Sequence, residues 1–356
     1  MSQLLEYKCP SCGASVEFNA KEQNMKCPYC DTEFDVDAMD GLEKELKTKE
    51  DYMEWSRSDT RIDDDESAGI NIFVCKSCGG EIVGGDVTVA TFCPFCDNPV
   101  VMKSRFVGEL RPDYVIPFKL DRDAAKAAYL KHLSGKKLLP KVFRSENHID
   151  EIKGIYVPFW LFSATADGDI TYRGTKTRFW SDSKYNYTVT SHYAIRRAGK
   201  LGFRNVPVDG SKRMDNELME SLEPFNISDA VDFKTAYLSG FFADRYDVSS
   251  ESCSKRANER IKASTEAEFR QTIHGYATLV TQSSGVSLED AQAKYALYPV
   301  WLLNTTWRDK KYVFAMNGQT GKFVGNLPID KGAWVRWFAL FAGIFTAAAV
   351  LIMHLL

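Results

Sequence analysis

Residues 9–30, CPSCGASVEFNAKEQNMKCPYC, contain two Cys-x-x-Cys pairs, and residues 75–96, CKSCGGEIVGGDVTVATFCPFC, contain two more. In both stretches fourteen residues separate the inner cysteines, so each cysteine of the first set recurs 66 positions later. Two thiolates three positions apart can bind one metal ion from a tight turn, and two such turns supply the four sulfurs of a tetrahedral zinc site. The spacing therefore predicts two zinc ribbons in tandem.

The predicted ligands form two sets of four cysteines. They are Cys9, Cys12, Cys27 and Cys30 in the first ribbon and Cys75, Cys78, Cys93 and Cys96 in the second. Four thiolates close the coordination shell, so the role expected for both sites is structural rather than catalytic. Zinc is the expected metal, and rubredoxin-type iron, which uses similar knuckles, is the alternative. Gly13 and Gly79 follow their pairs where a knuckle often needs positive φ, and Asp31 and Asp97 hold the equivalent place in the second knuckles.

The composition is that of a folded protein. The chain has 356 residues, 44% of them hydrophobic and 13% aromatic, which is enough for two or three domains with buried cores. The net charge of -3 does not predict nucleic-acid binding. Eight of the nine cysteines lie in metal-type pairs, which favours a reducing compartment, and no secretory signal precedes Cys9. Cys253 is left over as a residue with no predicted role.

The C-terminal stretch predicts a membrane anchor. Residues 337–353, WFALFAGIFTAAAVLIM, carry no charge, and a helix of this kind running to residue 356 matches the thickness of a bilayer core. Trp334 and Trp337 favour an interfacial position, whereas a buried C-terminal helix is the alternative. Lys331 and Arg336 precede the segment and no Lys or Arg follows it, so the positive-inside rule places the N-terminal bulk in the cytoplasm. We expect a single-pass protein of the cell membrane, although a continuation beyond Leu356 into another span is left open.

The expected fold class is α+β. The predicted order is zinc ribbon 1 (1–36), an acidic helix and linker (37–70), zinc ribbon 2 (71–104), a mixed α+β strand-rich domain (105–330) and a transmembrane helix (334–356). Residues 31–66 hold fifteen Asp or Glu against five Lys or Arg, with a helix expected over Asp40–Ser56 and a solvated linker over Asp59–Glu66. This acidic stretch is interpreted as a soluble spacer, with an acidic recognition segment as the alternative.

Within residues 105–330 several elements are predicted from local signals. Asp121 is expected to cap a helix over Arg122–Leu133, and further helices are expected over residues 211–222 and 250–272. Residues 165–178 and 185–197 alternate as two long strands joined by a polar turn, and residues 312–325 predict a hairpin. Residues 156–162 (YVPFWLF) resemble residues 298–303 (YPVWLL), which suggests two related halves.

Residues 170–213 form a basic stretch that includes many aromatic residues. They contain ten Lys or Arg against two Asp, with Trp180, Tyr185 and Tyr187 among the aromatics. Three interpretations are open: a solvated strand face, contact with anionic lipid or protein, and binding of single-stranded nucleic acid by charge and stacking.

The sequence contains no recognisable catalytic motif. A P-loop, a G-x-G-x-x-G turn and an H-E-x-x-H pair are all absent. The histidines (His132, His148, His192, His274 and His354) pair with no nucleophile motif. The chain is therefore predicted not to be an enzyme.

Four stretches give the chain a resemblance to a known family. They are Cys93-Pro-Phe-Cys96, Tyr156-Val-Pro-Phe-Trp160, Gly240-Phe-Phe-Ala-Asp-Arg-Tyr246, and the region from Tyr298-Pro-Val-Trp301 through Thr320-Gly321. With these motifs the chain resembles bacterial transcription-factor-IIB-type zinc-ribbon proteins, often labelled primosomal or phage replication proteins, over nearly all of its length after residue 70.

The resemblance implies a membrane-attached zinc-ribbon protein that faces the cytoplasm. Cys75, Cys78, Cys93 and Cys96 match the family's ribbon. Some relatives are encoded near envelope-stress or flotillin-like membrane proteins, which implies a scaffold. A replication role is not supported, since no helicase P-loop is present.

The predicted function is a membrane-anchored adaptor whose zinc ribbons bind a cytoplasmic or membrane protein partner. The alternative is a membrane-tethered nucleic-acid-binding zinc-ribbon protein with a role in replication or transcription. No small-molecule substrate is predicted.

Overall fold

A computed structural model describes residues 7–46, 50–63, 65, 67, 70–85, 92–144, 151–308 and 310–355. The chain forms two compact units, each built from three separate stretches of sequence. Unit 1 comprises residues 1–56, 162–206 and 254–292, and unit 2 comprises residues 57–161, 207–253 and 293–356. This grouping does not test the five sequence-based domains, whose boundaries stay predictions. His148 lies outside the described residues.

Unit 1 begins with a small module around the first four cysteines, which we call module 1 (residues 7–46). Its three-stranded sheet has the order β1-β2-β3, with β1 at Glu17–Asn19, β2 at Asn24–Lys26 and β3 at Glu33–Phe34. Helix α1 (Val36–Leu46) follows. Met25 and Met39 are buried together with Cys9, Cys27 and Val16, so module 1 has a small core of its own.

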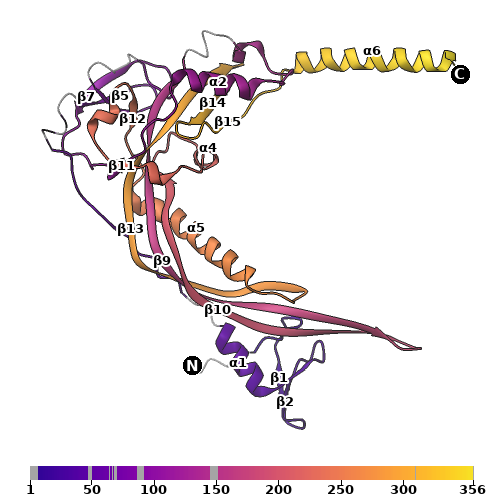
Figure 1. The fold of residues 1–356 in the computed structure, drawn as a ribbon. Coiled ribbons are helices and arrows are strands. Elements are labelled where there is room, and N and C mark those ends of the chain that lie inside the picture. The colour runs from indigo at the N-terminus through magenta and orange to yellow at the C-terminus, as the bar shows by residue number, and fades with distance from the viewer. Residues whose placement is uncertain are drawn as a thin grey trace. The chain divides into compact units, whose positions relative to one another are not determined.

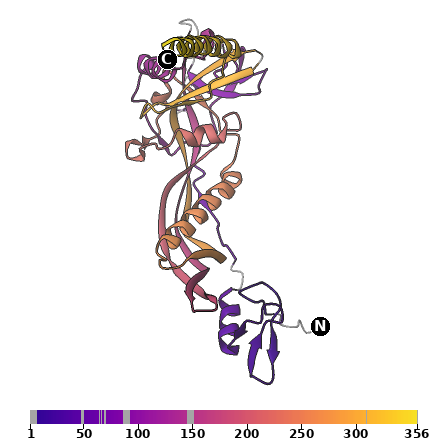
Figure 2. The same cartoon turned by 90° about the vertical axis from the view of Figure 1, so that its right-hand side faces the viewer.

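The rest of unit 1 is a long β-ribbon covered by a helix. The greater part of β9 (Lys153–Ser181) and of β10 (Asn186–Asp209) and the first half of β13 (Thr278–Trp307) run along it, and most of α5 (Ser250–Gln271) lies against them (Figures 1 and 2). The remaining residues of these elements belong to unit 2. Ala166, Ile261 and Val286 form one core between helix and strands, and Tyr172 and Phe269 belong to a second. The two long strands and the 250–272 helix predicted from sequence are confirmed.

Unit 2 is organised around one mixed sheet. Its strands follow the order β11-β8-β13-β9-β12-β6-β5-β7, with β14 paired to β13 and β15 paired to β14. The pairs β12–β9 and β13–β8 are parallel, whereas β5 pairs antiparallel with β6 and β7. The shorter strands are β5 (Ile70–Cys75), β6 (Glu81–Gly85), β7 (Val100–Arg105), β8 (Tyr114–Val115), β11 (Val231–Asp232), β12 (Phe242–Asp244), β14 (Lys310–Asn317) and β15 (Phe323–Gly325).

Short helices cover this sheet. They are α2 (Arg122–Leu133), α4 (Asn216–Ser221) and the 3₁₀ turns η1 (Lys141–Arg144), η2 (Ile227–Asp229) and η3 (Thr235–Leu238). Asp121 caps α2 by accepting a hydrogen bond from the Ala124 N–H at 2.8 Å, as predicted. The helix expected over residues 211–222 is shorter than predicted, because Asp215 caps it and it begins at Asn216. The predicted 312–325 hairpin is the antiparallel pair β14–β15.

The repeated aromatic stretches lie in neighbouring strands of this sheet. Residues 156–161 belong to β9 and residues 298–303 to β13, and the Phe159 and Tyr298 rings stack at 4.6 Å. Both stretches are buried. The two similar sequences therefore lie side by side in the core of unit 2.

The acidic stretch differs from its prediction. The helix expected over Asp40–Ser56 is α1, which begins earlier at Val36 and ends at Leu46, and β4 (Ser56–Arg57) is already extended. Trp55 packs edge-on against Phe162 at 4.8 Å and donates a hydrogen bond to Asn258. Tertiary packing of this indole thus overrides a weak helical pattern.

The predicted solvated linker is partly anchored as well. Ile62 is only 2% exposed, and its N–H donates to the Glu109 carbonyl at 2.9 Å. Arg61 donates to the Gly108 carbonyl from the same segment. The interpretation of the whole 59–66 segment as solvated is therefore wrong.

Candidate metal centres

All four cysteine knuckles share one backbone geometry. In each knuckle the N–H of the first cysteine donates a hydrogen bond to the carbonyl of the residue five positions later. The N–H of the residue four positions after that cysteine donates to the cysteine's own carbonyl. These hydrogen bonds are 2.7–3.0 Å long. The residue that closes the turn has positive φ in every case: +80° at Gly13, +56° at Asp31, +72° at Gly79 and +58° at Asp97. Gly and Asp tolerate this conformation better than most residues, which explains their place after each pair.

The knuckles bring the predicted ligands together in two clusters. Cluster 1 is Cys9, Cys12, Cys27 and Cys30, and cluster 2 is Cys75, Cys78, Cys93 and Cys96; within each group the sulfurs lie within 4.8 Å of one another. The closest Sγ–Sγ distances are 3.5 and 3.6 Å in cluster 1 and 3.4 and 3.7 Å in cluster 2. Zn–S bonds of about 2.3 Å in a tetrahedron place sulfurs about 3.8 Å apart. Both donor sets therefore fit structural zinc.

Cluster 1 belongs to a module with little else in its core. Cys9 and Cys27 are buried, whereas Cys12 and Cys30 are exposed. Between Cys27 and Cys30 lies Tyr29, whose side chain is 83% exposed.

Cluster 2 is built into the main core of unit 2. Cys75 ends β5, and both Cys75 and Cys93 are fully buried in one core with Ile116, Val157 and Tyr298. Phe95 holds the place equivalent to Tyr29 and is 8% exposed. The same Cys-Pro-aromatic-Cys motif is thus a surface feature in cluster 1 and a core feature in cluster 2.

Polar side chains from distant strands hold the second knuckle of cluster 2. Asn304 on β13 donates to the Pro94 carbonyl at 2.8 Å, and Lys311 on β14 donates to the Phe95 carbonyl. Lys153 at the start of β9 ion-pairs with Asp97 at 2.5 Å. These contacts join the knuckle to three strands of the sheet.

An arginine contacts the first knuckle of each cluster. Arg213 donates to the Gly79 carbonyl at 3.2 Å, and within unit 1 Arg173 donates to the Pro10 carbonyl at 3.0 Å. Four thiolates around one Zn²⁺ carry a net charge of about -2, so nearby cations lower the electrostatic cost of the site.

A hydrogen-bonding residue follows the last cysteine of each cluster by two positions. Thr32 Oγ1 lies 3.1 Å from Cys30 Sγ, and its side chain and backbone lower the pKa of Cys30 to about 6. In cluster 2, burial raises the pKa of Cys96, but hydrogen bonds from the Asn98 side chain and backbone outweigh it and lower that pKa to about 6. Both contacts favour the thiolate, which is the form that binds metal.

The sequence predicted the eight clustered cysteines and the four turn residues but not these supporting residues. Lys153, Asn304, Lys311 and Arg213 lie 56 or more positions from the knuckles they contact, and no local motif marks them. Thr32 and Asn98 could have been found, because both are hydrogen-bonding residues at the same offset from a cysteine. Cys253 joins neither cluster; it is buried, and its thiol donates to the Asp209 carbonyl.

The C-terminal helix α6 (Lys331–Leu355) is the one helix among the described residues long and apolar enough to cross a membrane. Its most apolar 18-residue window has a mean hydropathy of 2.0 and is 0% buried, so the buried-helix alternative is not supported. Asp330 begins the helix by accepting a hydrogen bond from the Gly332 N–H at 3.0 Å. Lys137 lies 4.7 Å from the Trp337 ring, which ties the start of α6 to unit 2.

The basic stretch is divided between the two units. Residues 170–206 belong to unit 1 and residues 207–213 to unit 2. Arg196 pairs with Asp169 at 2.7 Å, and Lys200 pairs with Glu289 at 2.6 Å. Several of the ten cations therefore neutralise nearby acids.

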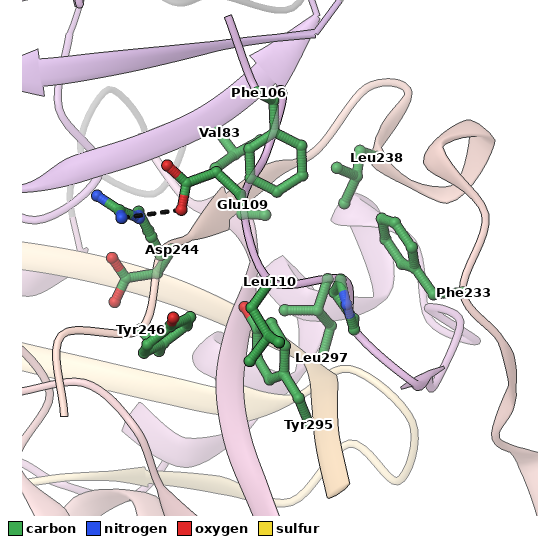
Figure 3. Close-up of a pocket in the computed structure, with 13 residues that line it drawn as sticks. Val83, Phe106, Glu109, Leu110, Phe233, Leu238, Asp244, Tyr246, Tyr295 and Leu297 are labelled. Carbon is green, nitrogen blue, oxygen red and sulfur yellow. Dashed lines mark ion pairs between the residues drawn. The ribbon is translucent and has the colours of Figure 1, made fainter. Parts of the chain in front are cut away.

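Unit 2 has a small cavity beside a buried carboxyl group. The cavity has a volume of about 10 Å³, enough for one water molecule at most, and Asp244, Tyr295 and Leu297 line it (Figure 3). Burial raises the pKa of Asp244 to about 7, although Ser211 Oγ donates to it at 2.5 Å and Arg213 lies 3.2 Å away. Tyr295 is fully buried beside it, and its pKa is raised by burial and by Asp244.

An open polar cleft of about 370 Å³ lies nearby, between Gly79 and Ser249. Two arginines line it, and both are already ion-paired. Arg213 pairs with Asp244 and Asp247, and Arg245 pairs with Glu81 and, at 2.8 Å, with Glu109. The pair with Glu109 is the dashed line in Figure 3. The charges of this cleft are thus balanced by neighbouring side chains.

Fold and site together define an α+β protein with two four-cysteine clusters suited to structural zinc and one C-terminal candidate membrane helix. The chain is 32% identical over 340 residues to "Uncharacterized protein YdjG" of Bacillus subtilis (strain 168), covering 96% of this chain and 95% of that protein. It belongs to the same family as YdjG. No family model and no solved structure matches the chain.

Proposed function

We propose that this protein is a non-enzymatic, membrane-anchored zinc-ribbon adaptor of the transcription-factor-IIB type that faces the cytoplasm and binds a protein partner. The observation that carries the proposal is the pairing of two closed four-cysteine clusters with an exposed apolar helix at the C-terminus. A closed shell leaves no position for substrate, so its use is to hold a surface in shape. The apolar helix supplies the anchor.

Module 1 is the better candidate for the partner-binding surface. It has a separate small core, and its Tyr29 is exposed within the second metal-binding turn, between Cys27 and Cys30. A tyrosine on a rigid turn is a typical interface anchor, since it offers a large contact area with few rotatable bonds. Cluster 2, by contrast, has its aromatic residue in the core and stabilises unit 2.

The test is affinity purification of the full chain from solubilised membranes, with Tyr29→Ala compared with Tyr52→Ala. Tyr52 is a matched control because it is also an exposed tyrosine of unit 1, 62% exposed, and lies outside module 1. Loss of an anchor tyrosine is expected to weaken the affinity for the partner by at least about 30-fold, or about 2 kcal/mol of binding free energy. The Cys9→Ser/Cys12→Ser double variant should lose the same partner.

All variants should stay in the membrane fraction, because α6 is unchanged. A partner that every variant retains, or one that Tyr52→Ala also loses, contradicts a role for module 1. Orientation is checked separately: protease added outside intact cells should leave the region before α6 uncut.

Nucleic-acid binding remains the second candidate, since aromatic and basic residues are both exposed at the end of the β9–β10 hairpin. Pairing of Arg196 and Lys200 with acids leaves fewer cations for phosphates than the sequence suggested. Salt-titrated binding of single-stranded DNA or RNA to the full chain tests it, because each neutralised phosphate steepens the salt dependence. Absence of binding at low salt would exclude it.

A further inference from the structure

The end of the β9–β10 hairpin is exposed on both of its faces. Strands β9 and β10 extend beyond β13 and α5 as a two-stranded ribbon (Figure 1). Every residue from 178 to 191 is exposed, and we call this segment the hairpin tip. An isolated two-stranded ribbon gains little stability from water-exposed apolar groups, so a structural core does not explain its composition.

The turn at the hairpin tip is well defined. Asp182 Oδ1 accepts hydrogen bonds from the N–H groups of Lys184 and Tyr185, both at 2.7 Å. Its Oδ2 accepts from the Tyr187 hydroxyl at 2.8 Å. The carboxylate is therefore engaged within the turn, and these hydrogen bonds, from the Lys184 N–H first, lower its pKa.

Aromatic side chains cover this ordered turn. Phe179 is 75% exposed, Tyr185 is 66% exposed and Trp180 is 50% exposed. The Trp180 ring stacks on Tyr187 at 5.3 Å, with 12° between the planes. Large apolar groups gathered at an exposed site mark a contact surface.

The charge around the hairpin tip is positive. Residues 176–191 contain three basic residues (Lys176, Arg178 and Lys184) and one acidic residue, Asp182, which gives a net charge of +2. No ion pair within the described part of the chain involves Arg178 or Lys184. Both cations are therefore available to an external anion.

We propose that the hairpin tip docks onto the surface of a lipid bilayer that contains anionic lipids. Trp and Tyr concentrate at the headgroup level of bilayers, where an aromatic body and a polar edge are both solvated well. Arg178 and Lys184 then meet lipid phosphates, each cation strengthening binding by about fivefold. This contact would exist whether or not module 1 binds a protein partner.

Two observations favour a bilayer over nucleic acid. Trp180 and Tyr187 already stack on each other, so each ring has only one face left for a base. The chain also carries α6, and an anchor in a membrane raises the effective concentration of a second membrane-binding site.

The experiment measures quenching of Trp180 by lipids brominated near the headgroup, with the full chain reconstituted in vesicles. The chain has seven tryptophans, so the Trp180 signal is the difference between the wild type and Trp180→Phe. Vesicles of phosphatidylcholine alone are compared with vesicles that also contain phosphatidylglycerol. Because Trp334 and Trp337 lie in α6, their quenching shows that reconstitution succeeded.

The expected result is quenching of Trp180 in the anionic vesicles, with less in phosphatidylcholine alone and less at high salt. The Arg178→Ser/Lys184→Ser variant should weaken it, whereas Lys21→Ser, an exposed lysine of module 1, should not. Absence of Trp180 quenching in anionic vesicles overturns the proposal. The proposal is also overturned if single-stranded nucleic acid or a protein protects the hairpin tip while lipids do not quench Trp180.

Discussion

Cys93→Ser and Cys27→Ser remove equivalent ligands, and we expect very different consequences. Both sulfurs are fully buried, at 0% exposure, and both begin the second knuckle of their cluster. Cys27 packs only within module 1, whereas Cys93 shares the main core of unit 2. The same substitution therefore tests which part of the fold each metal site stabilises.

The magnitude follows from comparing metal binding with folding. A structural zinc contributes about 10–16 kcal/mol of apparent binding free energy, whereas a domain is stable by about 5–15 kcal/mol. Losing the zinc contribution of cluster 2, about 10–16 kcal/mol, removes as much free energy as stabilises a whole domain and is enough to unfold unit 2. In cluster 1 the same loss unfolds module 1 and leaves the core of unit 2 intact.

The assay combines zinc stoichiometry with amide hydrogen exchange of the full chain in detergent. Cys27→Ser should lose one zinc and exchange faster only within residues 7–46. Cys93→Ser should lose one zinc and exchange faster across β5, β6, β9, β12 and β14. Cys253→Ser is the control, because Cys253 is buried but belongs to neither cluster, and it should keep both zinc ions.

Equal and local effects of Cys27→Ser and Cys93→Ser would refute the reasoning. That result would mean that the second cluster, although buried, does not support the fold of unit 2. Unchanged zinc content in both variants would refute the metal assignment itself.

Three further predictions follow from single side chains. Because burial raises the pKa of Asp244 to about 7, the unfolding free energy should fall as the pH rises from about 4 to 7; urea unfolding measured across that same pH range should show a smaller pH dependence in Asp244→Asn but not in Asp247→Asn. Asp121→Ala removes the cap of α2 and should cost about 1 kcal/mol in the same measurement, and no change would show that the cap is dispensable. Phe95→Ala should cost about 3–5 kcal/mol, whereas Tyr29→Ala should cost less than about 0.5 kcal/mol; equal costs would contradict the difference in burial.

The sequence was most informative where chemistry is local. Ligand identity and turn geometry depend on residues within a few positions of one another, so the cysteines and the positive φ at Gly13 and Asp97 could be predicted. The cap at Asp121 is local in the same way. The apolar C-terminal helix was predicted from composition alone.

What the sequence could not reveal depends on distant contacts. Lys153 and Lys311 come from strands far along the chain, so nothing near Cys93 indicates that its knuckle is buried in a sheet. The helix predicted through Ser56 failed because Trp55 packs against Phe162, more than a hundred positions later. The exposure of Tyr29 and the burial of Phe95 could not be distinguished from two nearly identical motifs.

The discontinuity of unit 2 has a consequence for biosynthesis. Its core needs β13 and β14, and β14 ends at Asn317, only fourteen residues before α6 begins at Lys331. During translation, unit 2 therefore cannot complete its sheet until the apolar helix is itself about to be made. Module 1 needs only residues 7–46 and can take up metal much earlier. Folding of the core of unit 2 and synthesis of the candidate membrane helix thus fall in the same short interval of translation.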